Sequence, residues 1–290
     1  MAYVSYENLP IYFGGINTAT LPGSREATAS GVMATQATLN YTPNIAATRL
    51  LGEIADKNSF TLAGPPNATL SFTTLLANDG GTAFNPSGFT GDIGDLGATF
   101  KIGDPDNGIS GSGAFLTSYS YTVAPYAPIT IQADFAIYNP LRFDSTRHGG
   151  DIASSGIGAS PVTPSIEATG LAHGAYSEFN GASLADVDVF ESAAYSYQAN
   201  RLPVYKIGNS CVDKVEFLTA QQSIQIQGDN ISAIVPMTGD TPGEIVIELK
   251  NQNSDVLLSG NVDGNITAQN IAMSAGNLAR GSITVTQPLK

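Results

Sequence analysis

Alternation of apolar and polar residues is the strongest pattern along the chain, and it predicts β-strands. In residues 115–123, apolar side chains occupy every second position opposite serine and threonine, and residues 129–137 repeat this pattern. The segment 124–128 between them contains two prolines, which favour a turn. We therefore expect one long hairpin over residues 115–138.

Shorter alternating runs predict further strands, at residues 39–41, 68–75, 98–102, 224–226, 245–249 and 282–286. Nowhere does an apolar pattern with a period of 3.6 residues persist over three turns. The predicted class is therefore mainly β with little helix.

An internal repeat organises these strands. Residues 193–209 align with residues 37–53 without a gap, at an offset of 156, which places Tyr197 on Tyr41. Each copy ends about a hundred residues later with the dipeptide Pro-Leu. The matching order and spacing predict a duplicated unit, and the alternative is two unrelated β-rich halves that share turn residues. Pro203 in the second copy favours a loop or short turn over a helix at residues 44–56 of the first.

The repeat divides the chain into four parts. We expect an extended N-terminal arm over residues 1–36, a β domain over 37–141, a connecting loop over 142–185 and a second β domain over 186–290. The connecting part is rich in Gly, Ser and Ala and is too long for a simple turn, so it is interpreted as a functional loop or a crossover between domains.

The chain is acidic but sparsely charged. Of 290 residues 13% are charged, and the formal net charge is −13. Binding of nucleic acid through its phosphates is not expected, because it requires clustered Lys and Arg. Cys211 is the single cysteine, so an intrachain disulfide and a thiolate metal cluster are excluded. The sequence lacks a secretory-signal pattern and long apolar runs, so we expect no membrane span and synthesis in a reducing cytoplasm.

The two histidines are the first candidates for chemistry. His148 and His173 both lie in the Gly-rich connecting part, where a metal site with Asp144 or Asp151 is one interpretation. Exposed loop histidines are the commoner case, and no Gly-x-Ser-x-Gly motif accompanies them to indicate a nucleophilic serine.

Acidic residues form two further candidate sites. Asp104–Gly108 begins like a calcium loop but lacks the later ligands, and its Asn-Gly dipeptide favours a hairpin turn. Asp186 and Asp188, with Glu191 nearby, present paired carboxylates that suit general acid and base catalysis. A charged edge strand that blocks wrong pairing is favoured instead. The sequence therefore predicts no enzyme, no cofactor and no metal site.

The repeated unit resembles the tail tube proteins of tailed bacteriophages. The resemblance is carried by a strand, then residues 44–52 or 200–208, then a Gly/Pro break and a second strand. The closing segments 118–135 and 265–286 also look like the final hairpin of that family. The resemblance covers most of residues 30–141 and 186–290, and the tandem duplication is its departure from a single-domain tube protein.

This resemblance implies a structural virion protein without catalytic residues, assembled in the host cytoplasm. It implies a β-sandwich subunit whose inner strands join across subunits into a barrel around a DNA channel. Two domains in one chain predict a ring of three chains with pseudo-sixfold symmetry. The expected partners are further copies of the chain, other tail proteins and DNA that passes without specific binding.

The negative charge suggests how such a channel avoids holding DNA. Carboxylates on the wall repel phosphate over about 8–10 Å at physiological salt. The candidate lumen-facing acidic residues on the polar sides of strands and in turns are Asp134, Glu244, Glu248 and Asp255.

A second hypothesis comes from a different class of protein. A virion surface decoration protein or a carbohydrate-binding β-sandwich would use exposed aromatic residues, for which Tyr126 and Tyr176 are candidates. The chain has no tryptophan, the favoured residue for stacking on sugars, and this weakens the hypothesis. An electron micrograph of the purified protein would distinguish the two.

Overall fold

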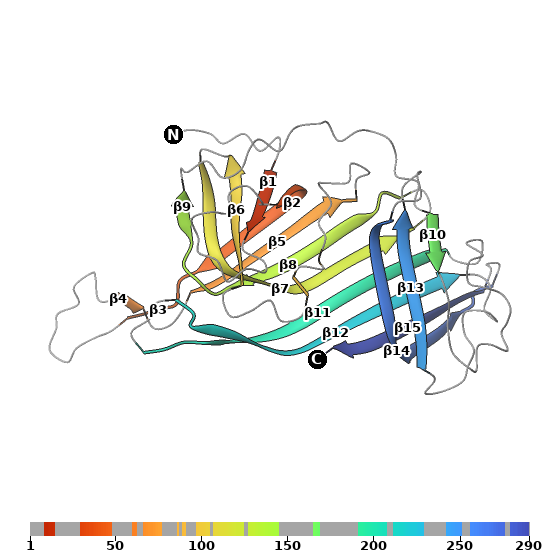
Figure 1. Cartoon of the computed structure of the whole chain (residues 1–290). Helices are drawn as coiled ribbons and strands as arrows, with labels where there is room; N and C mark the ends of the chain where they lie inside the picture. The colour runs from red at the N-terminus through yellow and green to blue at the C-terminus, as the bar shows by residue number, and fades with distance from the viewer. Residues whose placement is uncertain are drawn as a thin grey trace.

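The strands of the computed structural model confirm the mainly β class (Figure 1). The structure describes residues 9–14, 30–47, 60–62, 66–76, 86, 89–90, 97–104, 107–124, 127–144, 165–168, 191–207, 211–228, 242–250, 256–275 and 279–289. In these residues the strands are β1 Leu9–Gly14, β2 Ser30–Thr42, β3 Ile45–Ala47, β4 Phe60–Leu62, β5 Asn67–Leu75, β6 Ala98–Asp104, β7 Asn107–Val123, β8 Thr130–Ile137, β9 Arg142–Asp144, β10 Ser165–Ala168, β11 Ser192–Val204, β12 Lys214–Gly228, β13 Pro242–Lys250, β14 Val256–Ala272 and β15 Arg280–Leu289. Within them, no helix is long and apolar enough to cross a membrane.

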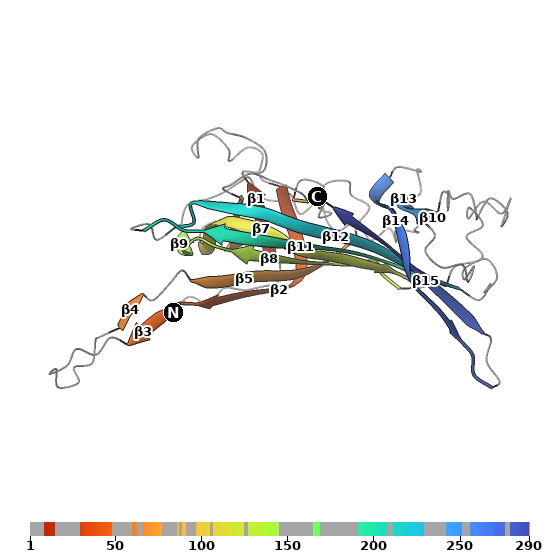
Figure 2. The ribbon, with the colours of Figure 1, turned by 90° about the horizontal axis from the view of Figure 1, so that it is seen from below.

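Thirteen of the described strands form one sheet, in the order β10-β13-β14-β15-β12-β11-β7-β6-β1-β2-β5-β8, with β9 paired to β7. All the pairings are antiparallel. The remaining pair, β3 and β4, forms a small ribbon that extends beyond β2 and β5 (Figure 2). Residues 45–47 are thus a strand, at the start of the segment where a loop or turn was predicted.

The first strands close on themselves. β7 pairs with β6, β6 with β1, β1 with β2, β2 with β5, β5 with β8 and β8 again with β7. Across this circuit Phe13 of β1 stacks on Phe135 of β8, with ring centroids 4.9 Å apart. The N-terminal arm predicted over residues 1–36 was expected to pack on its own or a neighbouring domain. Within it, β1 is part of the sheet, and its Ile11 and Phe13 are buried in the core.

The later strands continue the same sheet. β11 pairs with β7, and β12, β15, β14, β13 and β10 follow in that order. Part of β14 lies over β7 and β11: a Cβ atom added at Gly260 would lie 2.6 Å from the Tyr121 Oη atom and 2.9 Å from a ring carbon of Tyr195. The earlier and the later strands therefore both cover one face of the sheet that contains β7 and β11.

The order of pairing is the same in the two groups. From β1 the first set runs β1-β6-β7-β8-β5-β2, and from β10 the second set runs β10-β13-β14-β15-β12-β11. If the six strands of each set are numbered in sequence order, both paths read 1-4-5-6-3-2. β2 and β11 each contain 13 residues, and β7 and β14 each contain 17. We call these groups the first and second strand sets; the domain boundaries themselves stay predictions.

The registers of the two sets also correspond. Leu39 of β2 pairs with Leu70 of β5, which pairs with Phe135 of β8. In the second set Tyr195 pairs with Ile224, which pairs with Val285. Phe135 and Val285 are then each opposite an apolar residue of the next strand, Leu116 of β7 and Ile266 of β14.

A shared bulge strengthens this correspondence. Thr117 is the extra residue in β7 between Leu116 and Ser118, and Thr267 is the extra residue in β14 between Ile266 and Ala268. The Thr117 Oγ1 hydroxyl donates to the carbonyl oxygen of Asp134 at 3.0 Å, and that of Thr267 donates to the carbonyl oxygen of Thr284 at 3.4 Å. Because Ser118 pairs with Asp134 and Ala268 with Thr284, the two hydrogen bonds are equivalent.

The predicted hairpin over residues 115–138 is confirmed by the pairing of β7 with β8. The turn at residues 104–108 is confirmed as a hairpin turn, but its position differs from the prediction. Asp104 pairs with Asn107, so the Asn-Gly dipeptide belongs to the start of β7.

Candidate functional site

The central sheet, made of β2, β5, β8, β7, β11, β12 and β15, has one buried face and one polar face. Residues of β8 alternate strictly between the two, with Ile131, Ala133, Phe135 and Ile137 buried. The buried residues of neighbouring strands lie opposite these, so the polar residues align across the sheet as well.

The polar face consists of three rows of mostly hydroxyl and amide side chains. The first row contains Thr38, Ser71, Asp134, Ser118, Gln198, Gln221 and Pro288; the second contains Gln36, Thr73, Gln132, Ser120, Ser196, Ser223 and Thr286; the third contains Leu75, Thr130, Thr122, Ala194, Gln225 and Thr284. These rows run from the first strand set into the second without interruption.

Hydrogen bonds between neighbouring strands fix several of these side chains. The Ser118 hydroxyl donates to the Asp134 carboxylate, with 2.5 Å between the oxygens. The hydroxyls of Ser196 and Ser223 are 2.8 Å apart. Such short polar side chains satisfy one another along the sheet while their remaining lone pairs face solvent.

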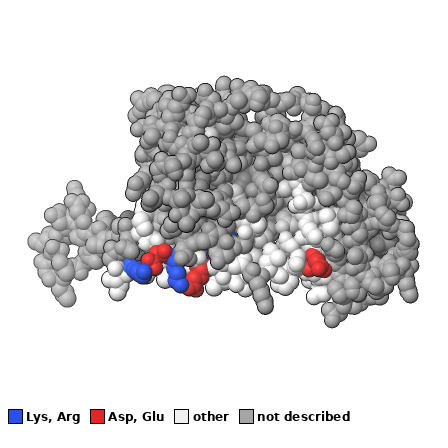
Figure 3. Space-filling model, viewed as in Figure 1, with Lys and Arg blue, Asp and Glu red and all other residues white. Residues whose placement is uncertain are grey.

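The three rows carry very little charge. Asp134 is their one ionisable residue, and they include neither Lys nor Arg. Cations appear beyond them, where Lys214 pairs with Glu216, and Lys206 with Asp213 at 2.9 Å. On the side that Figure 3 presents, neighbouring basic and acidic residues form one group at the lower edge of the described surface, and a separate acidic residue lies among white ones. The rows themselves offer phosphate no cationic partner.

The predicted acidic residues are described only in part. Asp134 lies in the first row on β8, where it is half-buried beside Ser118. Glu244 and Glu248 belong to β13, which pairs with β10 and β14 and not with β8. The side chains of these two glutamates, and Asp255 altogether, lie outside the described residues. Their proposed place in a channel wall stays a prediction.

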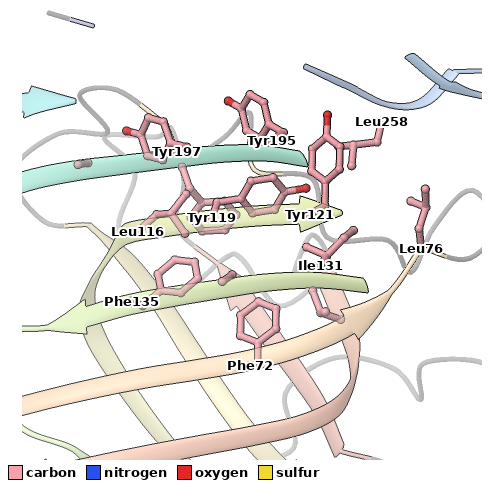
Figure 4. Close-up of a cluster of buried hydrophobic side chains, with 14 of the residues drawn as sticks. Phe72, Leu76, Leu116, Tyr119, Tyr121, Ile131, Phe135, Tyr195, Tyr197 and Leu258 are labelled. Carbon is pink, nitrogen blue, oxygen red and sulfur yellow. The ribbon is translucent and has the colours of Figure 1, made fainter. Parts of the chain in front are cut away.

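On the opposite face, tyrosines from both strand sets meet beneath β14 (Figure 4). The rings of Tyr121 and Tyr195 stack with centroids 5.2 Å apart, and Tyr119 meets both at 6.1 Å. Burial raises the pKa of Tyr195 to about 12 and raises the pKa values of Tyr119 and Tyr121 further. The Tyr195 hydroxyl donates to Gln222, whereas the buried Tyr121 hydroxyl has no hydrogen-bond partner within the described residues. These tyrosines belong to the hydrophobic core.

The other candidate sites lie partly outside the described residues. His148, His173, Asp151, Asp186, Asp188, Tyr126 and Tyr176 all belong to that excluded part of the chain. Of the candidates that are described, Glu191 pairs with Arg280 at 2.7 Å, and Cys211 is exposed. Among the described residues, His, Cys, Asp and Glu nowhere gather in a group of three that would hold a metal ion.

Comparison with known proteins assigns the chain to no family. No family model matches the chain, and no curated protein matches it. Inference about function therefore depends on the sheet itself.

Sequence reasoning identified alternation in eight strands but missed the rows. The eight are β2, β5, β6, β7, β8, β12, β13 and β15. The polar face is assembled from segments far apart in sequence, as the contact between Ser196 and Ser223 illustrates. The available signal was the chemistry of the outward positions: in β7, β8, β11 and β12 they are mostly Ser, Thr or Gln, and Lys and Arg are lacking in the stretches that form the rows.

Proposed function

We propose that the chain is a tail tube subunit of a tailed bacteriophage, which assembles into stacked rings around a conduit for DNA. The observation that carries this proposal is the polar face, a broad sheet surface that continues across both strand sets without cationic residues in its rows. DNA moves along such a surface without gaining counterion-release affinity. The sequence resemblance described above supports the same function.

The recurring strand order supports the proposed ring geometry. Two equivalent strand sets in one chain supply two similar wall segments, so three chains would supply six. In this arrangement the polar face lines the channel. The lining is then mainly neutral and hydrogen-bonding, with Asp134 as a carboxylate within it. Virion location and contacts with other tail proteins belong to the same proposal.

The test is electron microscopy of the purified chain over a range of concentrations, combined with light scattering. We expect rings with a central channel and three chains per ring, which stack into tubes. A monomer at every concentration, with no rings or filaments, would overturn the proposal. A monomer that also binds glycans on an array would instead support the carbohydrate-binding alternative.

A substitution tests the conduit directly in assembled tubes. Ser120→Lys and Gln132→Lys place cations in the second row of the polar face, where their wild-type residues pair with each other. We expect tubes of this double variant to retain short duplex DNA with a salt-dependent affinity that wild-type tubes lack. Leu218→Lys, at an exposed position outside the rows, is the control. Equal DNA retention by the variant and the control would contradict a lumen position for this face.

A further inference from the structure

The junction between the two strand sets has a counterpart at each end of the chain. Residues 118–123 of β7 pair with residues 193–198 of β11, on the edge of β7 that also carries β6. By register, the equivalents of these segments are residues 268–273 around the end of β14 and residues 37–42 of β2. The described pairings give β14 the neighbour β15 here, and give this part of β2 the neighbour β5.

Apolar residues that the internal junction buries are exposed at both ends. Tyr197 is 1% exposed in β11, whereas its equivalent Tyr41 in β2 is 45% exposed. Val123 is 2% exposed at the end of β7, whereas its equivalent Met273 after β14 is 75% exposed. Each end thus presents an apolar side chain where its equivalent packs against a neighbouring strand.

We propose that β14 of one copy pairs antiparallel with β2 of a second copy, in the register that β7 makes with β11. This inference rests on the proposed tube function and specifies its subunit interface. Tyr119 and Tyr121 pair with Tyr197 and Tyr195 at the internal junction. At the equivalent positions, Ile271 of one copy lies opposite Leu39 of the next, and Gln269 lies opposite Tyr41.

The same register continues both faces of the sheet from copy to copy. At the neighbouring position of this register, Asn270 of one copy lies opposite Asn40 of the next. Both asparagines are exposed, and their neighbours Ser282 and Thr69 lie on the polar side of their strands. Leu39 and Ile271 pack partly against the buried core, so the apolar side continues as well. Main-chain hydrogen bonds supply affinity in such strand addition, and two exposed sheet edges are removed.

The interface is head-to-tail, because each copy contributes a β2 edge to one neighbour and a β14 edge to the other. Such an interface produces a ring if the rotation closes and a filament if it does not. It therefore generates an assembly of many copies from one type of contact.

Disulfide crosslinking tests the pairing in the full chain. Cys211→Ser removes the native thiol, and Asn40→Cys with Asn270→Cys then forms the matched pair. The mismatched control, Thr38→Cys with Ala268→Cys, uses equally exposed positions that the register separates by four residues, about 13 Å along the strand. A disulfide requires Cα atoms within about 7 Å. On a non-reducing gel we expect covalent multimers from the matched pair alone.

The outcomes distinguish this interface from the proposed function. If micrographs contain tubes but the matched pair fails to crosslink, or both pairs crosslink equally, the pairing is wrong and the tube function stands. If neither rings, tubes nor crosslinks form, both proposals fail.

Charge provides a second measurement that does not depend on oxidation. Asn40→Lys with Asn270→Lys places like charges opposite each other, whereas Asn40→Glu with Asn270→Lys places opposite charges there. We expect the first variant to raise the concentration needed for assembly by roughly two- to fivefold relative to the second. Circular dichroism should be the same for both, since positions 40 and 270 are both exposed. Equal assembly of the two variants would overturn the proposed register.

Discussion

Replacing Gly260 with alanine tests how closely β14 lies over the tyrosines of β7 and β11. The added Cβ would lie 2.6 Å from the Tyr121 Oη atom and 2.9 Å from a ring carbon of Tyr195. Contacts this short force the buried rings or β14 to shift. Overpacking of this kind costs about 1–3 kcal/mol. A loss of 1 kcal/mol lowers the melting temperature by roughly 2–4 °C in a large domain, so a fall of several degrees is expected.

A second substitution separates this contact from general strain. Tyr121→Phe removes the nearest atom and also removes a buried hydroxyl that lacks a partner among the described residues. Alone it should leave stability unchanged or raise it by about 1 kcal/mol. In the double variant the cost of Gly260→Ala should fall by about 1 kcal/mol, which is a coupling typical of residues in contact.

Thermal unfolding and urea unfolding of the four proteins in this cycle supply the measurement. Ser259→Ala, at the exposed neighbouring position of β14, is the control and should be close to neutral. If Gly260→Ala were as stable as the wild type, or cost the same with and without Tyr121→Phe, the packing of β14 on these tyrosines would be refuted.

Three further predictions concern the two faces of the sheet. The raised pKa values of Tyr119, Tyr121 and Tyr195 mean that the folded chain holds these protons more tightly than the unfolded chain, in which tyrosine titrates near 10. The free energy of unfolding should therefore hold below pH 10 and fall above it, by up to about 1.4 kcal/mol per pH unit for each tyrosine, and Tyr121→Phe should reduce the slope in alkaline urea titrations. Thr117→Val removes the bulge hydrogen bond to Asp134 and should cost about 0.5–1.5 kcal/mol in urea unfolding. Thr267→Val removes the equivalent bond to Thr284 and also the 2.8 Å hydrogen bond with Thr286, so it should cost at least as much, and a neutral Thr267→Val would argue against the equivalence of the two bulges. Ser118→Ala should cost about 1–2 kcal/mol by removing the hydrogen bond to Asp134, whereas Thr122→Ala in the same strand, at an exposed position, should cost less; equal losses would contradict the importance of that bond.

Local pattern predicted the strands well because one face of each is buried. The hairpin of β7 and β8 followed from alternation together with the proline-containing turn segment, since a shift by one residue would expose every apolar side chain. β1 was not predicted as a strand because six residues with a central Ile-Tyr-Phe run have no clear period. Phe13 is buried by contacts distant in sequence, including Phe72 and Phe135.

The repeat was detected where its spacing is constant and obscured where it is not. Ala193 and Tyr197 are both 156 residues after their equivalents in β2, which is the offset found by alignment. The two Pro-Leu dipeptides are not equivalent, because one follows β8 and the other lies within β15. The true signature of that hairpin is the pair Thr117 and Thr267, whose meaning depends on a bulge that alternation cannot locate.

The candidate site could be predicted only in composition. Ser, Thr and Gln at outward positions indicate a neutral polar surface, but its extent depends on which strands are neighbours. That order includes the pairing of β7 with β11, which joins segments about 70 residues apart. Loop closure over such distances leaves no trace in the local pattern.

β7 pairs with strands of both sets, β6 and β8 in the first and β11 in the second, and this has a consequence for synthesis on the ribosome. All six strands of the first circuit lie within residues 9–137, so the circuit is able to close while the second set is still being translated. Residues 118–123 then wait for β11, and at about 5–20 residues per second the intervening chain takes roughly 4–14 s to emerge. During that interval the edge is a template for strands of neighbouring nascent chains. Closely spaced ribosomes on one message should therefore increase misassembly, and slower initiation should improve the yield of folded protein.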